Sequence, residues 1–113
     1  MEDFLILIRE PDGRLNAHNE QETAMHRKNM NAWFEKYGKA GHIQNGSALS
    51  LTGKQIKGRD AQIIDQIHQV GTEIVGGYII LAAKDLDDAA AIMQTFPVYE
   101  VDGYIEIREL MKT

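Results

Sequence analysis

The sequence predicts an α+β domain with the ferredoxin-like order β-α-β-β-α-β. Residues 3–9 and 78–83 contain continuous apolar runs, which are typical of strands buried on both faces. Two other segments have helical periodicity, and each follows one of these runs. In a ferredoxin-like sheet the first strand and the strand before the second helix are central, so the apolar pattern and the topology agree.

Composition favours an ordinary globular protein, and we expect one domain over residues 1–113. The net charge is −5, which argues against nucleic-acid binding, and Lys54, Lys57 and Arg59 are interpreted as the solvated charges of a hairpin. The absence of cysteine excludes disulfides and thiolate sites. No apolar run approaches the ~20 residues of a membrane span, and no signal-peptide pattern is present, so we predict a cytoplasmic protein.

The first strand, residues 3–9, ends at the turn sequence Glu-Pro-Asp-Gly of residues 10–13, and a polar loop follows. A helix is predicted over residues 21–37, ended by Gly38 and Gly41. One stripe of this helix should face the sheet, and it contains His26, Met30, Trp33 and Tyr37.

The middle of the chain has a weaker pattern. Short strands are predicted over residues 48–52 and 61–65, with a third extended piece near Ile56 in the connection between them. Residues 66–75 are predicted to be irregular. The central strand 78–83 comes next.

The second helix begins after Asp85, a favourable N-cap residue, and we expect Pro97 to end it. Residues 104–109 alternate between apolar and polar side chains, as a half-exposed edge strand does. Two helices cover only one face of such a sheet. Because soluble monomers avoid large exposed apolar faces, we predict a homodimer whose sheets pack face to face.

Four stretches also carry a resemblance to a known family. They are the opening strand Phe-Leu-Ile-Leu-Ile, the run Gly76-Gly77-Tyr78, the helix start Asp85-Leu86-Asp87-Asp88-Ala89 with its later Phe96-Pro97, and the closing Gly103-Tyr104-Ile105-Glu106-Ile107-Arg108. Together they resemble the YCII-related family, also called DGPF-domain proteins. This resemblance implies the dimeric α+β barrel fold over nearly the whole chain.

The motif that gives the DGPF proteins their name is altered in this chain. Asp65-Gln66-Ile67-His68 stands where relatives carry Asp-Gly-Pro-Phe, so only the aspartate is retained. The later glutamate of the motif corresponds to Val70, and Glu73 matches another acid often found three residues before the double glycine.

His26 and Asp65 are the candidate catalytic residues. His26 should face the sheet, and a carboxylate beside it would fix its tautomer and make it a general acid or base near neutral pH. The resemblance implies the same pair, because the broader family often has a histidine on its first helix with an aspartate within reach. The alternative is a partly exposed histidine without a catalytic role.

Tyr78, Trp33 and Tyr104 are candidate ligand-binding residues, since aromatic side chains with a polar tip often line small-molecule sites. An ordinary core position is the stronger interpretation for Trp33. We predict no metal site and no cofactor, because His18, His26, His42 and His68 lack the spacing of metal motifs.

Two functions remain open at this stage. One is an enzyme that moves a proton on a compact, ring-like or carbonyl-bearing metabolite, as the resemblance implies for a fold class that includes lactone isomerases, dehydrohalogenases and monooxygenases. The other is a non-catalytic module that senses a small ligand or regulates a partner.

Overall fold

The structure is a computed structural model that describes residues 1–12 and 19–111, so the polar loop predicted after the first strand lies outside the described residues. Its elements follow the predicted order. They are β1 (Glu2–Pro11), α1 (Glu20–Lys39), β2 (Ile43–Ala48), β3 (Gln55–Lys57), β4 (Gln62–Ile64), β5 (Glu73–Ala83), α2 (Leu86–Met93), the short 3₁₀ helix η2 (Pro97–Val101) and β6 (Tyr104–Glu109).

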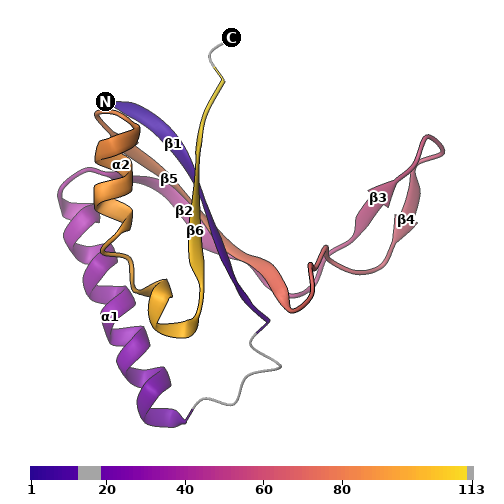
Figure 1. Cartoon of the computed structure of the whole chain (residues 1–113), viewed down its shortest axis with the longest axis horizontal. Coiled ribbons are helices and arrows are strands. Elements are labelled where there is room, and N and C mark those ends of the chain that lie inside the picture. The colour runs from indigo at the N-terminus through magenta and orange to yellow at the C-terminus, as the bar shows by residue number, and fades with distance from the viewer. Residues whose placement is uncertain (13–18, 112–113) are drawn as a thin grey trace.

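Four strands form one antiparallel sheet in the order β2-β5-β1-β6. The two apolar strands, β1 and β5, are its central pair, and β6 is an edge strand, as the sequence predicts. Both helices lie on the same side of this sheet (Figure 1). The α+β, ferredoxin-like fold class is therefore confirmed.

The two faces of the sheet have different surroundings. On one face, here called the helix face, Phe4, Ile6 and Ile8 alternate into the core and are buried. The neighbouring positions of the central strands point to the opposite face, here called the open face, and are only partly buried: Leu5, Leu7, Tyr78 and Ile80. A single chain thus covers one of the two apolar faces that the sequence predicts.

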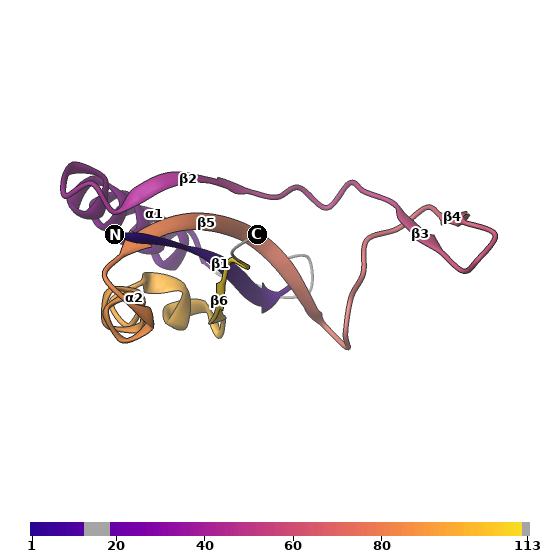
Figure 2. The ribbon, with the colours of Figure 1, turned by 90° about the horizontal axis from the view of Figure 1, so that it is seen from above.

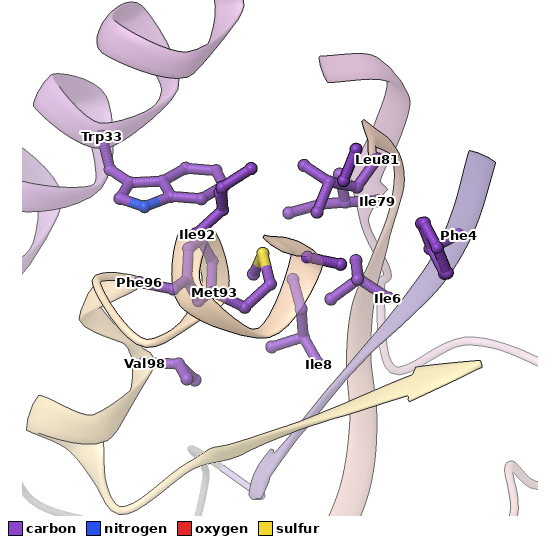
Figure 3. Close-up of a cluster of buried hydrophobic side chains, with 12 residues drawn as sticks. Phe4, Ile6, Ile8, Trp33, Ile79, Leu81, Ile92, Met93, Phe96 and Val98 are labelled. Atoms are coloured by element: carbon purple, nitrogen blue, oxygen red, sulfur yellow. The ribbon is translucent and has the colours of Figure 1, made fainter. Parts of the chain in front are cut away.

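Trp33 of α1 belongs to the buried core on the helix face, beside Phe96 and Ile92 (Figure 3). The Trp33 ring packs edge-to-face against Phe34 and Phe96, with centroid distances of 5.1 and 4.7 Å, and tilted against Tyr37 at 4.9 Å. These four rings are called the aromatic cluster below. The buried indole N–H donates to the Thr95 hydroxyl at 2.9 Å, which removes the cost of burying an unpaired donor.

Both helices begin at the expected kind of residue. The Asn19 side chain accepts a hydrogen bond from the Glu22 N–H at 2.8 Å, and the predicted N-cap Asp85 accepts one from the Asp88 N–H at 2.8 Å. The predicted end of α2 is wrong, because the helix stops at Met93 and Pro97 instead begins η2. Phe96 is extended (ψ 134°), the conformation that a following proline favours.

The strand predictions in the middle of the chain are partly wrong. Residues 49–52 lie outside the strands, and β2 occupies residues 43–48 instead, where the polar sequence Ile-Gln-Asn-Gly-Ser-Ala has no apolar alternation. Pairing with β5 at the sheet edge makes this segment a strand, so tertiary context overrides the local pattern. Strand β5 also begins at Glu73, inside the segment predicted to be irregular, whereas β3 at Ile56 and β4 are confirmed.

Residues 50–69 form a projecting segment, here called the arm. Its strands β3 and β4 pair only with each other, and it extends away from the main sheet on the side opposite to α1 (Figures 1 and 2). The radius of gyration is 15.7 Å. A compact chain of this length would have about 13 Å, so the arm is an extension without a core of its own.

Candidate functional site

A cavity of about 650 Å³ lies on the helix face, between the N-terminal half of α1 and the sheet. This volume falls within the range of small-molecule pockets. Strand β2 forms one wall, and Ile8 and Glu10 of β1 lie on another side. Helix α1 contributes Thr23, His26, Arg27, Met30 and Phe34. The aromatic cluster fills the space below the C-terminal half of the same helix. The cavity therefore lies below the N-terminal half, where the side chains are smaller.

His26 is the residue of this cavity with the best-defined orientation. Its Nδ1 lies 3.2 Å from Oε2 of Glu100, while the other oxygen of Glu100 accepts a hydrogen bond from the Asn29 amide at 2.8 Å. A carboxylate can only accept, so Nδ1 carries the proton and Nε2 of a neutral ring is left as an acceptor. About a quarter of the His26 side chain is exposed. The geometry is that of a positioned acid or base.

Glu10 is the second titratable group of the cavity. It lies on the helix face of β1, two residues after the buried Ile8, in the alternation of the strand. Burial raises the pKa of the Glu10 carboxyl, and the positive charge of His26 opposes this effect. The two side chains are therefore electrostatically coupled within one cavity.

The double glycine of β5 makes room for this carboxyl group. Strand β5 has an extra residue at Gly76 relative to β1, because Ile8 pairs with Gly77 and Arg9 with Val75. A Cβ atom at Gly76 would overlap the carboxyl group of Glu10. The first glycine of the motif thus allows a charged side chain to lie against the strand inside the cavity.

Asp65, the other predicted catalytic residue, does not meet His26 within one chain. It lies on the arm, where its Oδ1 is 2.6 Å from the Lys54 ammonium group and its side chain is 83% exposed. The carboxylate that contacts His26 is Glu100 of η2. A pair of His26 and Asp65 therefore needs the arm of a second copy and stays a prediction.

The three predicted ligand-binding aromatics lie in three different places. Tyr78 is among the residues that border the cavity, but the alternation of β5, with Ile79 buried on the helix face, points its side chain to the open face. Trp33 belongs to the aromatic cluster, is 5% exposed, and does not line the cavity. Tyr104 begins β6, and its hydroxyl donates to Oε1 of Glu73 at 2.7 Å.

Tyr104 is part of a polar network at the end of the sheet. Arg9 contacts Glu106 at 2.9 Å and Glu73 at 3.5 Å, so Glu73 joins the arginine to the tyrosine. The hydrogen bond to Glu73 is the main cause that raises the pKa of Tyr104, and the hydrogen bond to Glu106 is the main cause that raises that of Arg9. Both effects stabilise the protonated forms, which suits a structural network.

The described residues contain no group of three or more His, Asp or Glu side chains that could hold a metal ion. His18 lies outside the described residues. Neither α1 nor α2, the described α-helices, combines the length and apolar character of a membrane-spanning helix.

Comparison with known proteins places the chain in a family. The family model of the YCII-related domain matches residues 3–113, and the chain belongs to this family. A search of curated proteins gives no match. Among solved structures, the chain is similar to 5-chloro-2-hydroxyhydroquinone dehydrochlorinase from Burkholderia phenoliruptrix AC1100, solved in complex with 2,5-dihydroxybenzoquinone, with 18% sequence identity, a TM-score of 0.46 and 90% of each chain covered.

Sequence reasoning missed two residues of the site. Glu10 stands in a turn sequence before proline, and the signal that could have identified it is its place in the alternation Phe4, Ile6, Ile8. Glu100 is 74 residues away from His26, and only the packing of η2 beside α1 brings the two together.

Proposed function

We propose that this protein binds a compact, carbonyl-bearing or ring-like molecule in the cavity below α1 and moves a proton on it. The observation that carries the proposal is the presence of two coupled titratable groups, His26 and Glu10, in one half-open and mostly apolar cavity. Enzymes that abstract a proton next to a carbonyl group use such pairs, with one group acting as base and the other as acid.

The two groups have complementary roles in this proposal. His26, held through Nδ1 by Glu100, presents Nε2 as the base that removes a proton from carbon. Glu10, whose carboxyl pKa is raised by burial, is the acid that protonates the carbonyl oxygen as the enol forms. Transfer of the proton from His26 to a second carbon, with return of the enol proton to Glu10, completes an isomerisation. If a leaving group departs with its electron pair from the carbon next to the deprotonated one, while the carbonyl re-forms and the enol proton returns to Glu10, the result is an elimination.

The assembly that we propose with this function is a homodimer through the open face. Leu5, Leu7, Tyr78 and Ile80 make that face apolar at its centre, and a second sheet would remove them from water. Sedimentation analysis at micromolar concentration should give twice the mass of one chain. A monomer under these conditions would count against the face-to-face dimer.

Proton transfer can be tested by exchange of substrate hydrogen with solvent. Lactones, hydroxyquinones and β-keto acids are incubated with the protein in deuterated water, and deuterium incorporation next to the carbonyl group is followed by proton NMR. We expect exchange with the unchanged protein for a compound that also raises its melting temperature. The His26→Gln and Glu10→Gln variants should lose the exchange by about 10²-fold or more while still binding the compound.

Two matched controls separate chemistry from general damage. Glu35→Gln changes an exposed glutamate on the outer side of α1, and Glu109→Gln changes an exposed glutamate at the end of β6. Both should exchange at the rate of the unchanged protein. If a compound binds tightly but never exchanges, and the His26 and Glu10 variants bind it equally well, the non-catalytic ligand-sensing function is the correct one.

A further inference from the structure

The arm presents an apolar patch that has no partner within its own chain. Ile56 of β3 and Ile63 of β4 are directly opposite each other in the antiparallel pair, so their side chains lie on the same face of the hairpin. Their exposed fractions are 67% and 68%. A two-stranded hairpin with exposed isoleucines and no sheet behind it is only marginally stable in water. These features are typical of a segment that is covered by another molecule.

The charge of the arm differs from that of the rest of the chain. Residues 50–69 contain three basic residues and two acidic ones, a net charge of +1, in a chain whose net charge is −5. The remainder of the protein is therefore strongly acidic. An arm of this kind is complementary to the body of the same protein, and like-charged arms do not attract one another.

A surface suited to the arm lies beside the cavity entrance. It is a hollow of about 640 Å³ between the first turns of α1 and η2, and its apolar floor includes Met25, which is 56% exposed, and Val101. Glu22 and Glu100 lie at its rim, where Glu100 also contacts His26 and Asn29. Thr23 and His26 line both this hollow and the cavity, so an object in the hollow covers one side of the His26 site.

The arm cannot reach this hollow in its own chain as the structure stands, because it extends from the sheet on the side away from α1 (Figure 1). We propose that the arm of each chain docks on a second copy, with Ile56 and Ile63 in the hollow at Met25 and Val101. A twofold arrangement lets both arms dock at once and leaves no hollow unfilled. The occupant is thus a second copy of this chain, and the dimer closes each His26 site with a segment of the other subunit.

Disulfide trapping tests this docking because the chain has no cysteine of its own. Two variants are made separately, Ile56→Cys and Met25→Cys, then mixed and oxidised, so that a bond between the two positions can only join different chains. We expect a crosslinked dimer with roughly tenfold higher yield than random collision gives, because docking holds the two sulfur atoms at a high effective concentration. Mass spectrometry of a digest identifies the linked peptides.

The matched control replaces Met25→Cys by Ala24→Cys, an exposed position about 100° around α1 from Met25, on the outer face of the helix. The proposal requires much less crosslinking of Ile56→Cys with Ala24→Cys. Equal yields at the two positions, or no crosslink at either, overturn it. The readout needs no ligand, so this failure is distinct from a failure of the proton-transfer proposal.

A second variant keeps the test independent of cysteine geometry. Ile56→Glu combined with Ile63→Glu places two carboxylates on the patch, and because both side chains are exposed we expect the body to fold as before. In the dimer, the docked arm should protect residues 21–26 of α1 from hydrogen exchange. This variant should lose that protection. Unchanged protection would show that the arm does not cover this hollow.

Discussion

The two halves of helix α1 face the same sheet but are packed against it in different ways. The C-terminal half contributes Trp33, Phe34 and Tyr37 to the aromatic cluster, where large rings fill the space completely. The N-terminal half contributes Thr23, His26 and Met30 to a cavity of about 650 Å³. One helix thus provides both part of the packed core and a wall of the site.

The largest effect should come from the packed half. Trp33→Ala removes a buried ring and leaves the Thr95 hydroxyl without its donor, so we expect a loss of about 3–5 kcal/mol in the free energy of unfolding. Met30→Ala, one turn away and beside the cavity, should lose much less because this side chain is only partly buried. Urea denaturation of both variants measures the difference. Equal losses would show that the two halves are packed alike.

The next effect concerns the room that Gly76 leaves for Glu10. Gly76→Ala places a methyl group where the carboxyl group of Glu10 lies, so this flexible side chain must move away, and we expect a loss of about 1–2 kcal/mol. In the Glu10→Ala background the same change should be nearly neutral. A double-mutant cycle by urea denaturation gives the coupling energy between the two positions. Additive effects would mean that Glu10 does not lie over Gly76.

A smaller effect is expected at the start of α1. Asn19→Ala removes the side chain that accepts from the Glu22 N–H, at a cost of about 1 kcal/mol. The cap belongs to the half of α1 that carries His26. Hydrogen exchange should therefore accelerate more in residues 20–26 than around Trp33. Uniform acceleration along α1 would contradict a helix with two independently stabilised halves.

The smallest effect is a dependence on pH at Glu10. Its carboxyl pKa is raised in the folded state, so the folded state binds protons that the unfolded state has lost, and stability falls as the pH rises through this range. Glu10→Gln should therefore be slightly more stable than the unchanged protein at pH 7. The difference should vanish below about pH 3, where the carboxyl group is protonated in both states. A constant difference in urea midpoints at both pH values would exclude this explanation.

The sequence predicted the packed core of the molecule much better than the segments around the cavity. Central strands, caps and the sheet-facing stripe of α1 follow from local periodicity and from side chains that act on their own backbone, as Asp85 does. The strand β2 could not be predicted, because residues 43–48 are polar and become a strand only by pairing with β5. The alternation of β1 extends to Glu10, but proline and a turn sequence directly after it hide that pattern.

For the same reason, the sequence predicted His26 of the candidate site but not the carboxylate that contacts it. His26 follows from the spacing of one helix, whereas its carboxylate partner depends on how η2 packs beside α1. The resemblance to relatives implied Asp65 as the carboxylate partner of His26, but the fold places Asp65 on the arm beside Lys54. Contacts between segments far apart in the chain leave no periodic signal in one sequence.

The central claim is that His26 and Glu10 are coupled inside one cavity. Carbon-13 NMR of the glutamate carboxyl groups, with Glu10 assigned from the Glu10→Gln variant, measures the pKa of Glu10 directly. We predict a value above that of an ordinary glutamate, and a further rise in the His26→Gln variant because the opposing positive charge is gone. A Glu10 pKa that is ordinary, or that is the same with and without His26, would contradict the account.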